Sequence, residues 1–287
     1  MSGLHARAAH CDVEPVLILI VAAFLGAMVG VILGLTGAGG AIIAVPLLVF
    51  GLQLLVAEAA PIALLAVSIS AVIGALQALK QGKVRYRAAG FIAFTGALAS
   101  PVGIYMSQKL PNVALSLLFA AVLGYVSIST FRRPIHRSSK ATTTFLPATP
   151  CQLEDFSGRL IWDLHCARSL ALTGIAAGFL SGLLGVGGGF IIVPALQKAT
   201  LLPMQTIVPT SLAVIALVSG TGAFSAGLAG TMNWSIALPF AAGAVMAMLV
   251  VRRFADNFAN PTLQQCFAIL AACVSIGMII SQVQNLL

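Results

Sequence analysis

Long apolar segments follow one another along most of this chain. They cover roughly residues 15–35, 41–55, 60–79, 88–107 and 112–131, and they return at roughly 169–184, 189–201, 208–227, 235–251 and 263–283. Many approach the length of about 20 apolar residues that a helix needs to cross a bilayer. Because the segments are continuously apolar rather than alternating, they predict helices and not the strands of a membrane barrel. We therefore expect an all-α membrane protein with about 8–10 membrane segments.

Composition supports this class. Of the 287 residues, 60% are hydrophobic and only 8% are charged, whereas an ordinary soluble domain carries about 25% charged residues. Basic residues gather outside the apolar segments, at Lys80, Lys83, Arg85, Arg87, Arg132, Arg133, Arg137 and Lys140. Such residues concentrate in cytoplasmic loops, which places both groups on the cytoplasmic side of a bacterial inner (plasma) membrane. No soluble basic face exists for nucleic acid to bind.

The two halves of the chain align with each other at a constant offset of 148 residues. The glycines at 26, 30, 34, 37, 39 and 40 fall on those at 174, 178, 182, 185, 187 and 188, and Pro46 and Pro61 fall on Pro194 and Pro209. So many special residues at one offset indicate an internal duplication. We expect an N-terminal tail (1–14), a first transmembrane repeat (15–131), a polar cytoplasmic linker (132–168) with a short amphipathic helix near 156–166, and a second repeat (169–287).

Loop charge favours repeats of inverted orientation. The loop that corresponds to 80–87 in the second half, residues 227–234, carries no charge, and Arg252 and Arg253 follow the next segment instead. If those arginines are cytoplasmic, each half crosses the membrane an odd number of times and the repeats are inverted. If the short segments 41–55 and 189–201 are re-entrant, four crossings per half result and the arginines lie outside.

Glycine clusters interrupt corresponding apolar segments of the two halves, in GLTGAGGAIIAVP (34–46) and GLLGVGGGFIIVP (182–194). Paired breaks of this kind point to a transporter site. A helix that starts within the membrane leaves N–H groups unpaired and presents a positive dipole end, which together bind anions. The expected ligands for a small anion are the backbone amides of Gly37–Ala41 and Gly185–Phe190, around a shared central cavity, with the Thr36 hydroxyl added. The glycines concerned are Gly37, Gly39, Gly40, Gly185, Gly187, Gly188 and Gly189.

Two other interpretations of the glycines were weighed. Gly26, Gly30 and Gly34, like Gly174, Gly178 and Gly182, have the four-residue spacing of close helix contact, and we assign them that role. The denser clusters occupy several helix faces, which packing explains poorly. Neither cluster matches a phosphate-binding loop or a dinucleotide fingerprint, because no Lys-Ser or Lys-Thr follows and the third glycine is absent.

The paired G-x-x-G-x-G-G motifs, each followed by a proline, resemble those of the TauE/SafE family of sulfite and organosulfonate exporters. Pro209-Thr210-Ser211-Leu212 and the stretch ending at Trp234 are also similar to that family, and the resemblance covers nearly all of both halves. It implies a secondary transporter that exports small anions such as sulfite or sulfoacetate, with Thr210 and Ser211 near the substrate. The two halves differ where Ala41 aligns with Gly189 and where Ile62-Ala63 aligns with Thr210-Ser211.

Polar side chains within the segments fit an anion better than a cation. None of the seven acidic residues lies well inside a segment, so carboxylates for a metal ion or a proton pump are missing. Hydrogen-bond donors are present, and we add Gln77 to the candidate site because it is costly to bury unpaired. Other donors are Ser68, Ser70, Thr95, Ser100, Ser219, Thr221 and Ser225. The five cysteines form no pattern and show no metal-ligand spacing, so we expect no metal site. We also expect no cofactor.

Other functions stay open at this stage. An anion channel shares the same features, and a non-transporting membrane assembly subunit is a third class, although buried glycine clusters are hard to justify there. An enzyme is not expected, because the segments hold no nucleophile–base pair. The partners we expect are a small anionic substrate and membrane lipid, and the oligomeric state, a homo-oligomer included, is not fixed by the sequence.

Overall fold

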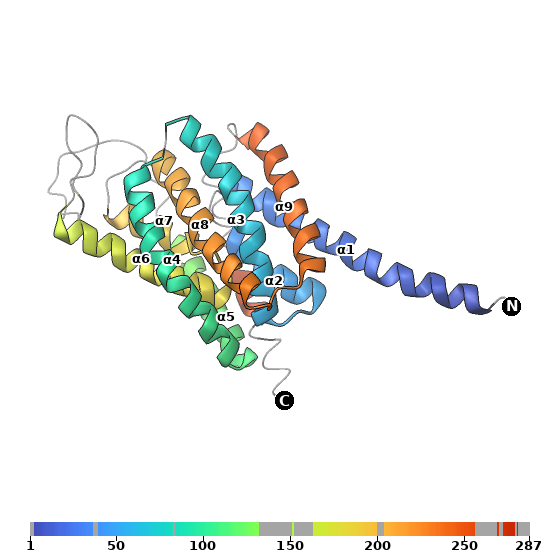
Figure 1. Cartoon of the computed structure of the whole chain (residues 1–287). Helices are drawn as coiled ribbons and strands as arrows, with labels where there is room; N and C mark the ends of the chain where they lie inside the picture. Colours follow the sequence, from blue (N-terminus) through green and yellow to red (C-terminus); the bar gives the residue numbers. More distant parts are fainter. Residues whose placement is uncertain are drawn as a thin grey trace.

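The structure is a computed structural model that describes residues 3–36, 40–82, 84–131, 151, 163–199, 204–255, 269, 272–278 and 280. All regular structure in these ranges is helical. The helices are α1 (Gly3–Thr36), α2 (Gly40–Leu52), α3 (Val56–Lys80), α4 (Tyr86–Lys109), α5 (Asn112–Phe131), α6 (Leu164–Leu184), α7 (Gly189–Ala199), α8 (Met204–Leu228) and α9 (Trp234–Ala255). Residues 272–278 form a further helical segment beside α5, to which the Ser275 hydroxyl donates a hydrogen bond at the Ala120 carbonyl (2.8 Å). Figure 1 shows the bundle and the first part of α1 projecting from it.

Six helices in the described ranges are long and apolar enough to cross a membrane. Their spans are Val16–Leu35, Val56–Lys80, Tyr86–Lys109, Leu164–Leu184, Thr206–Leu228 and Trp234–Val251. Shorter apolar stretches, Ile42–Leu52 and Asn112–Ile128, lie in α2 and α5. The predicted fold class, an all-α multi-pass membrane protein, is therefore confirmed.

The structure differs from the predicted boundaries at two places. The backbone of α1 already begins at Gly3, where the sequence suggested a tail, since this stretch is rich in the good helix formers Ala, Leu and Arg. Helix α6 begins at Leu164, five residues before the predicted second repeat, and the Asp163 side chain accepts the Leu164 N–H (2.8 Å). Most of the linker, with most of the amphipathic helix expected near 156–166, lies outside the described residues.

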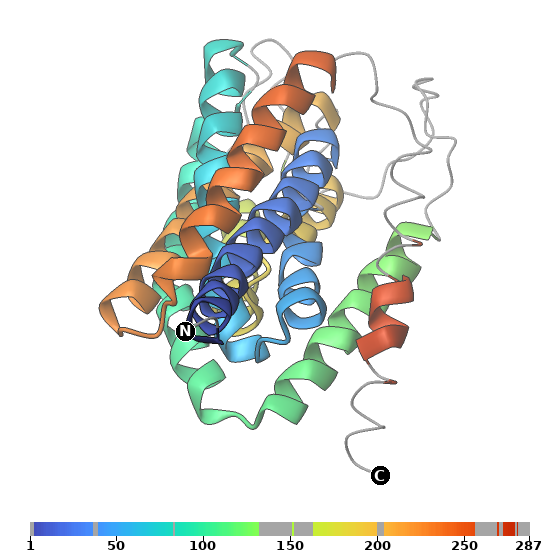
Figure 2. The same ribbon diagram turned by 90° about the vertical axis from the view of Figure 1, so that its right-hand side faces the viewer.

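Glycines hold each half of the chain against the other. Helix α1 packs along α9, and a Cβ added at Gly26 or Gly30 would collide with the carbonyl oxygen of Phe240 or Ala244. The pairing of α6 with α4 follows the same rule at the 148-residue offset: Gly174 meets the carbonyl of Ile92, and Gly178 that of Gly96. In both pairs, later residues of one helix contact later residues of the other, so the two helices of each pair are parallel. Figure 2 shows α9 lying along α1.

Helices α3 and α8 form the centre of the bundle and run antiparallel. Near the middle of both, the Ser68 hydroxyl donates to the Ala216 carbonyl, which lies 148 positions later (3.0 Å). The N–H of Arg85, just beyond the end of α3, donates to the Thr210 hydroxyl in the second turn of α8 (3.2 Å). The end of α3 therefore lies beside the beginning of α8.

These directions gather the basic side chains at one end of the bundle. Lys80 closes α3, Arg85 and Arg87 open α4, Arg168 lies in the first turns of α6, and Arg253 lies near the end of α9. Because α6 is parallel to α4, and α9 returns from the end of α8, all five lie at the same end. We call it the basic end. Glu58 and Lys109 lie at the opposite end.

Candidate functional site

The chain between α6 and α7 turns on glycine. Gly185, Gly187 and Gly188 have φ angles of 73°, 70° and 67°, a left-handed conformation that costs other L-residues roughly 1–2 kcal/mol each. The Gly185 N–H donates to the Ser181 carbonyl (2.8 Å) and ends α6. The Gly188 carbonyl accepts from Ile191 and Ile192 (3.1 and 3.2 Å) and begins α7. We call residues 185–188 the second glycine turn.

The second glycine turn leaves backbone donors unused. Residues 186–188 are buried, and within the described part of the chain the N–H groups of Val186, Gly187 and Gly188 have no hydrogen-bond acceptor. Most native proteins pair more than 90% of their buried backbone N–H groups, so three consecutive unpaired donors are unusual. They also lie directly before Gly189, the first residue of α7, where the positive end of the helix dipole adds to their attraction for an anion.

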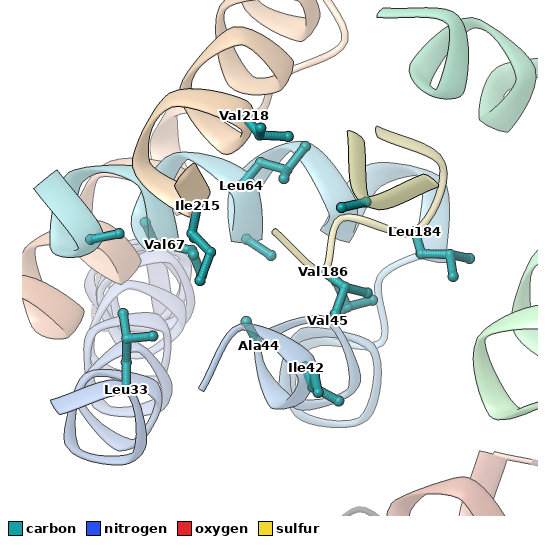
Figure 3. Close-up of a cluster of buried hydrophobic side chains, with 14 of the residues drawn as sticks. Leu33, Ile42, Ala44, Val45, Leu64, Val67, Leu184, Val186, Ile215 and Val218 are labelled. Atoms are coloured by element: carbon teal, nitrogen blue, oxygen red, sulfur yellow. The ribbon is translucent and has the colours of Figure 1, made fainter. Parts of the chain in front are cut away.

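Apolar side chains surround this turn. Gly185 lies so close to Ala60 of α3 that a Cβ would collide with the Ala60 backbone, and a Cβ at Gly188 would lie 2.8 Å from the Ala177 carbonyl oxygen. Figure 3 shows Val186 and Val45 of α2 in one cluster of buried hydrophobic side chains. A site with such walls has a low effective dielectric constant, which strengthens any hydrogen bond that the free N–H groups make to an anion.

The first glycine segment can be placed only by its flanks. Gly37 and Gly39 lie outside the described residues, as does the side chain of Thr36, while Gly40 is buried against Leu33 at the start of α2. Because α1 is parallel to α9, it ends towards the basic end. The second glycine turn instead packs on Ala60, near the start of α3, at the opposite end.

Thr210, Ser211 and Gln77 also lie towards the basic end. The Thr210 hydroxyl donates to the Thr206 carbonyl (2.6 Å) while it accepts the Arg85 N–H, and the Ser211 hydroxyl donates to Val208 (2.8 Å). Gln77 is half-buried in the last turn of α3.

The candidate residues therefore fall into two separate groups. Ala60 lies eight residues before Ser68 and Thr210 six before Ala216, so the second glycine turn and Thr210 are about 20 Å apart along the bundle at 1.5 Å per residue. The structure does not bring them into the one central cavity expected from the sequence.

A disulfide joins Cys151 to Cys166, both buried, and fixes a point of the linker to the first turn of α6 at the basic end. The sequence does not predict this bond. The spacing of 15 residues resembles no motif, so the sequence carried no signal for this bond.

Comparison with known proteins gives one consistent result. Residues 7–278 match the model of the family described as "Sulfite exporter TauE/SafE". The chain is 29% identical to the "Probable membrane transporter protein YunE" of Bacillus subtilis over 237 residues, which cover 78% of this chain and 84% of that protein. It is 28% identical to a "Probable membrane transporter protein" of Xylella fastidiosa, over 91% of this chain and 95% of the relative. No solved structure matches. With six candidate spans and a family match over nearly its whole length, this chain belongs to the TauE/SafE sulfite exporter family of membrane transporters.

Proposed function

We propose that this protein exports small oxyanions, sulfite or organosulfonates such as sulfoacetate, and that the second glycine turn binds them through its backbone N–H groups. One observation carries the proposal: Val186, Gly187 and Gly188 present three buried N–H groups that no acceptor in the described chain satisfies. An oxyanion offers the acceptors that these donors lack, and hydrogen bonds to a charged acceptor are roughly twice as strong as neutral ones.

The charged side chains at this end of the bundle are consistent with binding of an anion by the backbone. Glu58 and Lys109 lie at the same end of the bundle, and both are exposed. Recognition would therefore rest on backbone donors and the α7 dipole rather than on a buried charge. A site without a fixed cation releases its anion more readily, as a carrier requires.

The arrangement of the halves supports passage from one face to the other. We assign the basic end to the cytoplasm by the positive-inside rule, which puts the second glycine turn in the outer half of the membrane. The antiparallel α3 and α8 and the matched pairs α1–α9 and α6–α4 are what inverted repeats would produce. The first glycine segment would then serve the cytoplasmic half, with Thr210, Ser211 and Gln77 near it. Export moves an anion from the first segment to the second turn.

The test is transport by purified protein in liposomes loaded with labelled sulfite or sulfoacetate. Gly187→Ala forces a residue with a Cβ into a left-handed position and displaces the neighbouring N–H groups. We expect the flux to fall at least about tenfold, equivalent to about 1.4 kcal/mol. Gly90→Ala is the matched control, because a Cβ at Gly90 of α4 meets nothing within 4 Å. Equal flux through both variants and the wild type would refute the role of the turn.

A further inference from the structure

Four buried serine hydroxyls in the described chain have no hydrogen-bond partner. They belong to Ser70, Ser100, Ser181 and Ser219, and each residue is 0% exposed. A serine inside a membrane helix ordinarily donates to a carbonyl one turn earlier, as Ser107 does to Ile104 (2.8 Å) and Ser225 to Thr221 (2.8 Å). A buried hydroxyl without a partner can donate a hydrogen bond to a ligand that supplies an acceptor.

Ser181 and Ser100 lie next to the second glycine turn. Ser181 is one helical turn before Gly185, whose N–H donates to the Ser181 carbonyl (2.8 Å). Its neighbour Gly182 packs directly on the Ser100 carbonyl of α4. These two contacts hold the two serines within one turn of helix from each other and from the start of the turn.

Ser219 extends this group towards the centre of the bundle. The Ser100 hydroxyl points at α8, where it would lie 2.9 Å from a Cβ at Gly222, one turn beyond Ser219. Leu64 of α3, which follows Ala60 by one turn, reaches the same glycine (3.0 Å). Helices α3, α4, α6 and α8 therefore meet around these serines. Measured along the axis of α8 at 1.5 Å per residue, Ser219 lies about 5 Å beyond Ala216 and Gly222 about 9 Å beyond it.

The three hydroxyls have no counterpart at the positions that align with them in the other half of the chain. At the 148-residue offset, Ser100, Ser181 and Ser219 correspond to Met248, Leu33 and Ala71. The helix packing that the duplication preserves therefore works with apolar residues at these positions. Packing alone gives no reason for a hydroxyl at these three positions, whereas a ligand bound at the end of the bundle that holds the second glycine turn does.

We infer that Ser100, Ser181 and Ser219 donate hydrogen bonds to the oxyanion that the second glycine turn binds, and guide it between that turn and the α3–α8 contact. This inference rests on the proposed function and adds side-chain donors to it. Three hydroxyls beside three N–H groups suit an anion that carries three oxygens on one sulfur, since a carboxylate has only two oxygens to accept them. The group therefore selects sulfite and sulfonates over carboxylates of similar size.

The test compares Ser100→Ala and Ser181→Ala with Ser107→Ala, a control on α4 whose hydroxyl is already paired. In liposomes, the KM for sulfite is expected to rise about fivefold to tenfold in each of the first two variants, as for the loss of one hydrogen bond, and to stay unchanged in the control. The preference for methanesulfonate over acetate is expected to fall by a similar factor. Without anion, both variants are expected to unfold at the wild-type temperature or above it, because each loses an unpaired buried polar group.

The outcomes separate this inference from the proposed function. If the serine variants keep the wild-type KM and selectivity while Gly187→Ala loses transport, the turn binds the anion and the serines do not. If Gly187→Ala also transports normally, the proposed function fails as well. If the serine variants lose thermal stability without anion, more than Ser107→Ala does, the hydroxyls are structural and the inference is overturned. Ser219→Ala offers a third, independent site for the same comparison.

Discussion

Helix α6 and the second glycine turn that follows it contain two groups of glycines with different physical roles within fifteen residues. Gly174, Gly178 and Gly182 lie inside the helix, and each removes a side chain so that the α4 backbone can approach. Gly185 and Gly187 lie beyond its end and adopt positive φ. The first group is glycine because a side chain would not fit between the helices. The second group is glycine because the backbone has a positive φ there. The comparison teaches that glycine content alone does not locate a site, whereas glycine conformation does.

The largest effect is expected in the packing group. A Cβ at Gly178 would collide with the carbonyl oxygen and Cα of Gly96, and neither backbone atom can move without separating α6 from α4. We expect Gly178→Ala to lower the free energy of unfolding by about 3 kcal/mol, the upper range for overpacking. Unfolding in mixed detergent micelles measures this loss. A variant of wild-type stability would show that the two helices lie further apart than described here.

A smaller loss is expected in the turn. Gly187→Ala places an L-residue at φ 70°, which costs about 1–2 kcal/mol. The same unfolding assay should give a loss smaller than that of Gly178→Ala, while sulfite flux falls further than stability accounts for. Equal losses of stability in the two variants would remove the distinction between the groups.

A third change should have the opposite sign. Gly90 lies in α4 with an exposed surface and nothing within 4 Å of an added Cβ. Gly90→Ala therefore restricts the unfolded chain without a clash, and we expect a gain of about 0.4–1 kcal/mol. The midpoint of unfolding reports it. A loss at this position would mean that Gly90 has a contact outside the described residues.

The smallest effect is expected at the centre of the bundle. Ser68→Ala removes the hydrogen bond to the Ala216 carbonyl, and interhelical bonds in membranes average about 0.6 kcal/mol. The double variant with Gly178→Ala should show additive losses, because the two sites share no contacting residue. Strong coupling between them would indicate that α3–α8 and α4–α6 respond as one unit.

Much of the fold followed from the sequence, because apolar length and four-residue glycine spacing are local signals. The spans of α3, α4 and α8 fall within a few residues of those predicted, and Gly26, Gly30, Gly174 and Gly178 make the close helix contacts assigned to them. The early start of α6 was not predicted, since His165 and Arg168 interrupt the apolar pattern of residues 164–168, which join the helix through backbone pairing that hydropathy does not detect.

The candidate site was less predictable. Gly185 and Thr210 both belong to motifs and were therefore expected together. Gly185 instead packs on Ala60 near the start of α3, whereas Thr210 lies beside Arg85, beyond the other end of α3. Ser181 was not among the predicted donors, and a serine in a membrane helix usually bonds its own backbone. The absence of that bond is a property of the packed structure, and no residue pattern reports it.

The pairing of α1 with α9 also sets a condition on how the chain reaches its membrane. The Gly26 surface meets its partner near Phe240, which leaves the ribosome roughly 200 residues later, or at least about ten seconds at cellular synthesis rates. During that interval the backbone of α1 at Gly26 and Gly30 is not covered by α9. The native packing of α1 therefore cannot form until α9 has been synthesised and inserted.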